Sequence, residues 1–475
     1  MAYQIDSRTV VRAGWALSYG PGPNWQYITN NNPYGLGADP YTLPTLGNNQ
    51  PVSYLKDGLS YNAAAMYVAT LNPGAGLTPG TVTGSVGTLF DRNGGRPQRV
   101  NQWNIAIQRE LIPNVSLEMA YVGNRGAWLE SNQMGRANLL TVERLKAVGL
   151  DIDNAADRSL LTSPLSSTAV KARGFTVPYA NYPTGQTLAQ SLRPFPQFTG
   201  SIAPIWAPLG NSWYDSMQSK LTKRYSHGLD LTAAFTWSKA LGLGNGANGQ
   251  GGALGGGIND QFNRANQKSL SGSDRPFILT IGFNYSTPKI TSNKLVRYVT
   301  GDWIFGGILT YRSSSLISVP SSGTSNIGTY TFQSNTRYNV VSHDFFTLDP
   351  GCHCIDPNRD TKLVNAAAFQ DVSQGQWGFS APTYSDYRWV RSVNEQLSLG
   401  RSFPFGRERR MKLNVRVEMF NAFNRVTLPA PSASNPAQTP TYNSAGVQTG
   451  GFGFINTSSG ISGARTGQGV LRFEW

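Results

Sequence analysis

The sequence is poor in charged residues, histidine and cysteine, and these shortages narrow the classes of protein to consider. Charged side chains make up 14% of the 475 residues, against roughly 25% in an average soluble domain. Glycine is abundant, with 52 residues, and aromatic residues reach 11%. This composition does not fit a helical enzyme. It favours many short strands joined by polar loops rich in glycine and asparagine.

Long apolar runs are also missing from the sequence. No stretch approaches the roughly 18 apolar residues that a transmembrane helix needs, so no such helix is predicted. The start, Met1–Asp6, has neither the charged n-region nor the apolar h-region of a secretory signal. Because an exported protein needs that signal, we expect an internal start or a piece of a longer gene product.

The balance of charge is basic, with 40 Lys and Arg against 26 Asp and Glu, a formal charge of +14. Such a balance usually indicates nucleic acid or an anionic surface as partner. Here the cations are spread along the chain, and the one dense run is Arg407–Lys412. We therefore expect no nucleic-acid partner, and favour a phosphate-rich lipid surface or a channel lined with arginine.

The two cysteines, Cys352 and Cys354, are separated by His353 alone. A disulfide between them would close a strained small ring. A zinc site would need a second ligand pair, and neither His227 nor His343 offers a recognisable spacing. We expect a loop disulfide or two reduced thiols in preference to a metal site, and no cofactor.

Catalytic signatures are weak, and we predict that the chain is not an enzyme. With three histidines, a serine triad would have to use His227 in a short turn, His343 in a long loop, or His353. The glycine-rich run Gly242–Gly257 lacks the Gly-Lys-Ser/Thr ending of a phosphate-binding loop, so a flexible external loop is expected. Glu143–Leu150 is expected to form a short amphipathic helix within another long loop.

The informative pattern is a strict alternation of apolar and polar residues. In Gly228–Ser238, Leu229, Leu231, Ala233, Phe235 and Trp237 share one face, and polar residues fill much of the other. Lys412–Phe423 repeats the pattern. A period of two predicts strands with one apolar face. Val393–Phe403 is the weakest case, because Glu395 and Arg401 fall on its apolar face.

Ten segments share this alternation, each of about 9–13 residues, which is the length of a tilted strand that crosses a bilayer. Aromatic residues stand at the ends of their apolar faces, as membrane-interface girdles require. The segments are Thr9–Tyr19, Val100–Glu110, Val115–Val122, Trp213–Tyr225, Gly228–Ser238, Phe277–Tyr285, Trp303–Tyr311, Val393–Phe403, Lys412–Phe423 and Gly467–Trp475. The girdle aromatics are Tyr19, Trp103, Tyr121, Trp213, Tyr225, Trp237, Tyr285, Trp303, Tyr311 and Trp475.

The connections between these segments alternate in length, which separates a membrane barrel from a soluble β-sandwich. Tight turns at Ile112–Asn114 and Ser226–Gly228 follow long stretches such as Gly20–Arg99 and Gly123–Asn211. Outer-membrane barrels have short periplasmic turns and longer external loops. The sequence therefore predicts an all-β fold, a portion of an antiparallel transmembrane β-barrel of about ten strands, forming one region over residues 1–475. With a periplasmic C-terminus, an even strand count places the N-terminus in the periplasm too.

Two sets of residues in the predicted barrel are candidates for function. The first is a set of charged residues expected on the lumen face, where pairing between neighbouring strands is favoured over solute contact. These are Arg12, Lys220, Arg224, Arg312, Lys412, Arg416, Glu418, Arg472 and Glu474. The second is the last strand, whose apolar face Leu471, Phe473 and Trp475 ends in an aromatic carboxyl terminus. This ending resembles the signal by which the barrel-assembly machinery recognises its clients.

Several local strings occur in an order that resembles a known family. They are Asn101–Asn104, Ala120–Gly123, Leu192–Phe198, Leu221–Arg224 with Gly228-Leu229, Phe235–Ala240, Asp274–Pro276, Gly301–Trp303, Glu418–Asn424 and Ala464–Gly467. Together they resemble the C-terminal barrel of TonB-dependent receptor-like proteins of the Oar type.

This resemblance implies an incomplete part of a 22-stranded barrel in the outer membrane of a Gram-negative bacterium, with signal peptide and plug absent. It implies a receptor or transporter for an unidentified large solute, with surface adhesion or structure, or a passive porin, as alternatives. The implied partners are outer-membrane lipid and lipopolysaccharide, the barrel-assembly machinery, and TonB only through the missing plug. In the external loops, Trp206, Trp377 and Trp389 offer surfaces on which sugars could stack.

Overall fold

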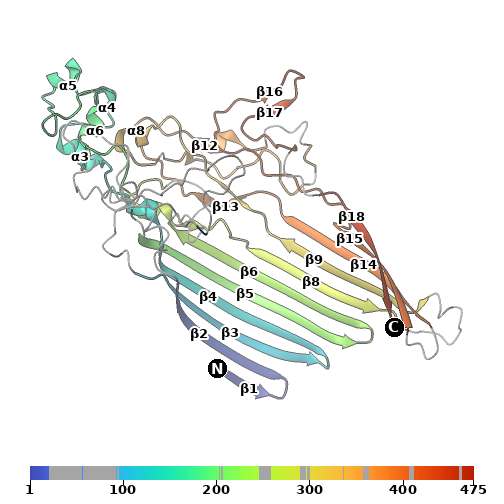
Figure 1. The fold of residues 1–475 in the computed structure, drawn as a ribbon. Helices are drawn as coiled ribbons and strands as arrows, with labels where there is room; N and C mark the ends of the chain where they lie inside the picture. Colours follow the sequence, from blue (N-terminus) through green and yellow to red (C-terminus); the bar gives the residue numbers. More distant parts are fainter. Residues whose placement is uncertain are drawn as a thin grey trace.

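A computed structural model shows one large antiparallel sheet with a layer of folded loops at one end of its strands (Figure 1). The structure describes residues 1–20, 56, 93, 96–202, 204, 207–244, 258–288, 296, 300–334, 336–352, 354–356, 363–405, 411–458 and 463–475. None of the helices in these residues is long and apolar enough to cross a membrane.

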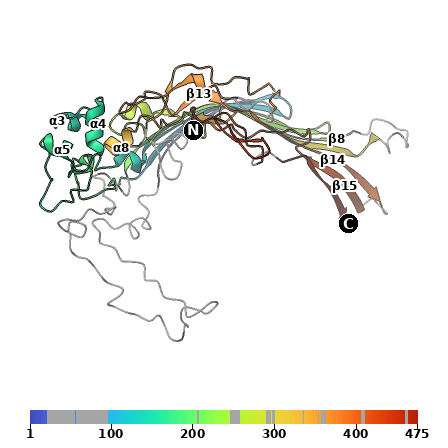
Figure 2. The same ribbon diagram turned by 90° about the horizontal axis from the view of Figure 1, so that it is seen from above.

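The strands of the large sheet, hereafter the wall, follow one another in chain order, each antiparallel to the one before. They are β1 (Ala2–Asp6), β2 (Thr9–Tyr19), β3 (Arg99–Ile112), β4 (Val115–Glu130), β5 (Pro208–Ser226), β6 (Leu229–Leu243), β8 (Phe277–Ser286), β9 (Trp303–Arg312), β14 (Ser392–Phe405), β15 (Met411–Phe420) and β18 (Thr466–Glu474). The short β7 (Ser269–Leu270) pairs with β6 off this path. Seen from above, the wall is curved (Figure 2).

The register aligns the apolar positions of successive strands. Ile105 on β3 lies between Ala13 on β2 and Tyr121 on β4, and Leu231 on β6 is opposite Phe283 on β8. A slip of one residue would move every apolar side chain of a strand to the other face. The wall therefore has one mainly apolar face and one polar face.

Short turns connect the strands at one end of the wall, hereafter the turn side. Asn114 (φ 67°) closes the turn between β3 and β4, and His227 (φ 53°) with Gly228 (φ 81°) closes the turn between β5 and β6. Asparagine and glycine tolerate this left-handed backbone better than most residues do. At Gly228 a Cβ would also lie 2.2 Å from the carbonyl oxygen of Ser286. His227 is thus a turn residue, as predicted.

At the opposite end, the loop side, the long connections fold into a layer with helices and strands of its own (Figure 1). Its helices are α3 (Val142–Ala147), α4 (Ala155–Thr162), α5 (Thr168–Ala172), α6 (Leu188–Ser191) and α8 (Ile327–Thr331), with 3₁₀ turns η3 (Asn132–Gly135), η4 (Arg264–Gln267) and η5 (Ala366–Ala368). Its strands form the pairs β10 (Leu316–Ser318) with β13 (Thr383–Arg388), β11 (Asn339–Val340) with β12 (Phe369–Gln370), and β16 (Thr441–Tyr442) with β17 (Gln448–Gly450). The predicted helix at Glu143–Leu150 corresponds to α3.

All ten predicted strands are present, but the topology at the N-terminus was predicted wrongly. β1 is an additional strand that turns at Ser7 and Arg8 and pairs antiparallel with β2, bringing Ala2 opposite Arg12. The N-terminal amino group donates a hydrogen bond to the Ala13 carbonyl, 2.8 Å away. The chain therefore starts partway up the wall and not at the turn side. Within the described residues, β1 and β18 each pair on one side only.

Candidate functional site

The polar face of the wall carries charges that pair with one another. Arg12 lies 3.8 Å from Glu118, and Arg416 lies 2.7 Å from Glu418. Arg472 on β18 lies 3.2 Å from Glu474. Such pairs are partly exposed and contribute little to stability, typically below about 1 kcal/mol each. The predicted lumen charges Arg12, Arg416, Glu418, Arg472 and Glu474 therefore have partners on this face.

Glu395, which interrupted the alternation in the sequence, is a buried carboxylate on the apolar face, 1% exposed. Arg425, just after β15, binds it with two hydrogen bonds of 3.1 and 3.2 Å. The hydroxyl of Tyr311 approaches the same carboxylate at 3.4 Å. The second interruption, Arg401, lies over the rings of Trp303 and Phe403. Both interruptions thus have local partners, and sequence reasoning missed Arg425.

The first half of the loop layer is organised around the buried guanidinium of Arg193, which is 2% exposed. Its Nε donates to the Asn138 carbonyl (2.8 Å), its Nη2 to the Gly200 carbonyl (2.8 Å), and a third hydrogen bond reaches the Thr199 carbonyl. Its planar face covers the ring of Phe332 at 4.1 Å. Burial lowers the pKa of Arg193 to about 10, which still leaves the group charged at neutral pH.

Around this residue the helices α3, α4, α5, α6 and α8 share one apolar core. Its fully buried members include Leu140, Leu145, Leu161, Leu188 and Ile327. Leu145 comes from α3, so that helix is an integral part of the core. The side chains of Thr141, Asn154, Ser167 and Thr187 accept hydrogen bonds from the first-turn amides of α3, α4, α5 and α6, which is the usual way to begin a helix.

The second half of the loop layer has an aromatic core. Phe345 and Tyr387 stack with ring centroids 4.5 Å apart, and Phe369 lies close to both. Trp389, 5% exposed, packs in this core and donates its indole N–H to the Leu428 carbonyl at 2.8 Å. Burial in the core raises the pKa of Tyr387.

The expectation of sugar-stacking tryptophans is wrong for Trp389. Trp389 is enclosed in the aromatic core, and Trp377 packs against the helical core. Trp389 therefore presents no open ring to a solute, whereas Trp377 is half-buried. Trp206 lies outside the described residues.

Asp371 joins two segments of the second half of the loop layer. The hydroxyls of Ser322 and Thr324 each donate to its carboxylate at 2.5 Å. Burial by itself would raise the pKa of Asp371, but these two hydrogen bonds and one from the Val372 amide outweigh it and hold that pKa below its ordinary value. The carboxylate is therefore charged at neutral pH.

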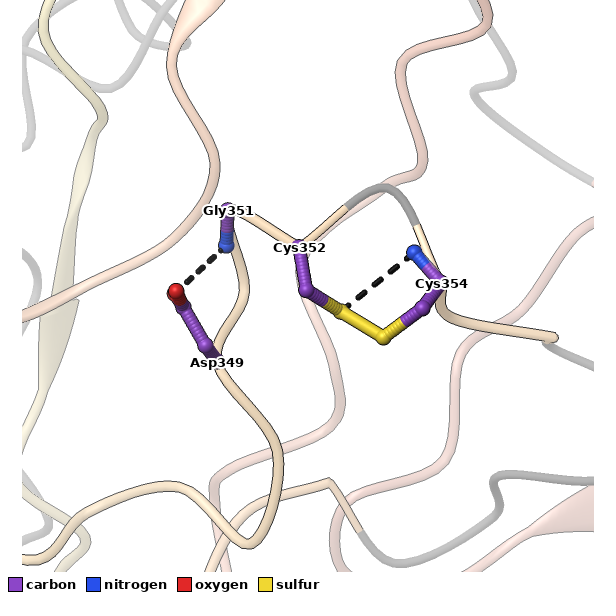
Figure 3. The surroundings of a disulfide bond; sticks show 4 residues. All are labelled: Asp349, Gly351, Cys352 and Cys354. Atoms are coloured by element: carbon purple, nitrogen blue, oxygen red, sulfur yellow. Dashed lines mark hydrogen bonds between the residues drawn. A yellow bond between two sulfur atoms is a disulfide. The ribbon is translucent and has the colours of Figure 1, made fainter.

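The two cysteines form a disulfide in the loop beside this core (Figure 3). The Cys354 amide donates to Sγ of Cys352 at 3.3 Å, and the Gly351 amide donates to Asp349 at 2.8 Å. The loop disulfide is thus one of the two states expected from the sequence. His353 lies outside the described residues, and the described residues hold no group of three potential metal ligands.

A cavity of about 770 Å³ opens where the loop layer meets β9 and β14. Tyr311 and Val393, register partners on the apolar face, form part of its floor. Phe423 and Val426 add apolar walls, and Arg391 adds a positive charge. A shallower hollow of about 410 Å³ shares the Pro350–Gly351 and Val390–Arg391 walls. The larger cavity is suited to an amphiphilic or aromatic group carrying negative charge.

The described histidine of the loop layer, His343, pairs with a carboxylate. His343 Nδ1 lies 2.6 Å from Asp386 Oδ2, and its ring packs edge-on against Phe345 and Tyr384. Both members of the pair are exposed. Of the glycine-rich run Gly242–Gly257, only Gly242–Gly244 are described, and Gly242 with Leu243 ends β6.

The predicted assembly residues Leu471 and Phe473 lie on the edge strand β18, and Trp475 follows it directly. Leu471 is opposite Val415, and Phe473 is opposite Leu413, so both extend the apolar face. The rings of Phe473 and Trp475 stack with centroids 5.9 Å apart. All three side chains are exposed. This geometry is compatible with recognition by another protein, and the assembly role stays a prediction.

An antiparallel wall with one exposed apolar face, a turn side and a folded loop side defines the class of transmembrane β-barrel proteins. The chain belongs to the outer membrane beta barrel domain family, whose model matches residues 1–468. It is a protein of the outer membrane of a Gram-negative bacterium. No curated protein matches the sequence significantly.

Similar solved structures are outer-membrane proteins. The outer membrane transporter YddB from Escherichia coli has 9% identity and a TM-score of 0.34, with 82% of this chain and 34% of that chain covered. The ferric citrate transporter FecA has 8% identity and a TM-score of 0.34, with coverages of 99% and 37%. FpvA of P. aeruginosa, solved with a pyoverdine and iron, has 8% identity and a TM-score of 0.32, with coverages of 90% and 28%. The chain spans about a third of the length of these proteins.

Proposed function

We propose that the chain forms the wall and external loop layer of a TonB-dependent, Oar-like receptor that imports an unidentified large solute. The loop side would face the cell exterior and the turn side the periplasm. TonB would act through a plug region outside this sequence. The barrel-assembly machinery would recognise the β18 ending, and lipopolysaccharide would surround the apolar face.

The observation that supports this proposal most directly is the folded loop layer. Its long connections bury two apolar cores and enclose a cavity of about 770 Å³ where the layer meets β9 and β14. Ordered loops of this kind are usual where a scaffold positions binding residues. A passive porin needs no such layer, because its solutes pass by diffusion. The layer therefore favours specific recognition.

The alternative that the same layer favours is surface adhesion, in which the loops bind a partner and nothing is transported. Both functions use the loop side, so energy dependence separates them. Uptake of the solute should stop when the proton gradient is collapsed if transport is energised. Uptake that continues would indicate a porin, and surface attachment without any uptake would indicate an adhesin.

The test begins with the DNA upstream of Met1, where a signal peptide, TonB box and plug in frame would support the transporter. A complete gene of these strands with its own signal would contradict it. Next, residues 314–391 are deleted, which removes Trp389 and the Phe345–Tyr387 stack. The matched control deletes the hairpin 441–450, which contributes to neither core. Loss of uptake in the first variant alone supports the proposal. Loss of attachment with unchanged uptake would support adhesion.

A further inference from the structure

The apolar face changes character at the loop-side ends of β3–β6, where cations and aromatics replace aliphatic residues. In one row of register partners, Trp103, Gly123, Asp215 and Lys239 follow one another across the four strands. In the next row towards the loop side, Asn101, Arg125, Trp213 and Leu241 follow. All these side chains lie on the same face of the wall as the apolar residues nearer the turn side.

Five cations and one carboxylate form this surface, hereafter the cation belt: Arg96, Arg99, Arg125, Lys239, Lys268 and Asp215. Arg96 and Arg99 lie over the ring of Trp128 at 3.9 and 4.3 Å, and Lys268 lies over Trp213 at 4.2 Å. Stacking of this kind orients a cation without neutralising it. The belt therefore keeps its positive charge.

The single carboxylate of the belt, Asp215, already accepts hydrogen bonds from neighbouring side chains. Asp215 accepts two hydrogen bonds from Arg125, of 3.0 and 3.1 Å, and one of 2.7 Å from the Tyr121 hydroxyl. Lys239, its register partner, makes no hydrogen bond or ion pair within the described residues. One negative charge against five positive charges leaves a net attraction for anions.

The position of the belt along the strands places it at a membrane boundary. Arg125 lies ten residues after Val115, where β4 begins, and Lys239 lies ten residues after Leu229, where β6 begins. Ten residues of strand span about 33 Å, and a tilt near 40° reduces the height to about 25 Å. This is about the height of the apolar band of an outer-membrane barrel.

Directly below the belt lies a surface suited to acyl chains. The next row towards the turn side runs Ile105, Tyr121, Met217 and Trp237, and the row after it includes Ile107 and Met119. Ile105, Met119 and Trp237 are exposed. A ligand lying across both zones would place hydrocarbon on these rows and an anion on the belt.

We infer that the cation belt binds the phosphate groups of a phosphorylated glycolipid of the surrounding leaflet, whose acyl chains lie on the apolar rows below. Phosphate suits the belt because guanidinium and ammonium groups are its usual protein ligands. Several cations at a membrane boundary act together on anionic headgroups. The inference rests on the orientation given above, in which the loop side faces outward, but not on transport.

The test measures binding of diphosphoryl lipid A to the full chain in detergent by native mass spectrometry. The variant R125Q/K239Q/K268Q removes three belt charges and should weaken binding at least tenfold. The matched control R12Q/K220Q/R416Q removes the same charge from the polar face and should bind as the parent does. Equal losses in both variants would overturn the site, because net charge alone would then explain binding.

A second variant separates a binding role from a structural one. Asp215→Asn removes the competing carboxylate and frees Arg125, so lipid binding should become tighter by severalfold. Weaker binding by this variant, with the sheet intact by circular dichroism, would contradict the site.

The probes distinguish the ligand. A phosphate-free glycolipid should bind at least tenfold more weakly than diphosphoryl lipid A, and inorganic phosphate at millimolar concentration should not displace the lipid. Equal binding of the phosphate-free lipid would overturn the proposal, and so would displacement by free phosphate. These measurements involve no solute, so their outcome does not depend on whether the protein is a transporter, an adhesin or a porin.

Discussion

The Nε of Arg193 donates a 2.8 Å hydrogen bond to the carbonyl of Asn138, joining positions 55 residues apart in the chain. With two further carbonyls on the same guanidinium, this contact holds the segment Phe195–Gly200 against the start of the loop layer. Arg193→Met should leave buried carbonyls unpaired and destabilise the helical core by roughly 3 kcal/mol or more. Hydrogen exchange should show α3–α6 losing protection while the wall keeps it.

Arg193→Lys provides the control for charge in that experiment. Lysine keeps the positive charge, but it lacks the planar guanidinium group that donates hydrogen bonds to several carbonyls at once. It should therefore lose most of the same protection. Full protection in the lysine variant would show that charge alone, and not the hydrogen-bond geometry, organises the core.

Arg425→Ala should destabilise the wall because it leaves the buried carboxylate of Glu395 without its positively charged partner. A buried charge without its partner is far less stable than the paired state. We expect a fall in melting temperature of roughly 5 °C or more, read from heat-modifiable gel mobility. The double variant E395L/R425L should recover much of the loss. If the melting temperature of the double variant is no higher than that of Arg425→Ala, apolar side chains cannot replace the ion pair at this position.

Acid should loosen the contact between Asp371 and the Ser322–Thr324 segment. Because the folded state holds the pKa of Asp371 below its ordinary value, its stabilising effect is present above the unfolded pKa of about 4. It is lost as pH falls through the lower folded pKa. Protection of Ser322–Thr324 from hydrogen exchange should therefore decline below about pH 4. Asp371→Asn should show low protection at every pH, and a variant that still responds to acid would assign the effect to another group.

Removal of Phe473–Trp475 from a version that assembles normally should abolish insertion into the outer membrane. The apolar face of the edge strand would lose Phe473, together with the Trp475 ring that stacks on it. The matched control R472Q/E474Q changes the polar face of the same strand and should insert normally. Membrane fractionation measures both, and normal insertion of the truncated form would contradict an assembly signal at this end.

The strands of the wall were predictable because alternation is a local signal, repeated in each segment. β1 was missed because Ala2–Asp6 shows only two apolar outward positions, Tyr3 and Ile5, before the turn. Arg425 could not be assigned to Glu395, since 30 residues separate them. The loop cores were equally hidden: Gln333 donates to the Leu140 carbonyl across 193 residues. Contacts between residues so far apart in the chain leave no pattern in the local sequence.

The hairpin of β16 and β17 projects from the loop layer (Figure 1). Its turn is held by Asn443, whose side chain accepts from the amides of Ala445 and Val447, so the turn closes without help from either apolar core. A short epitope inserted between Ser444 and Ala445 should disturb this turn alone and leave both cores intact, because the hairpin belongs to neither. An antibody that labels it on unbroken cells would establish directly which end of the wall faces outward.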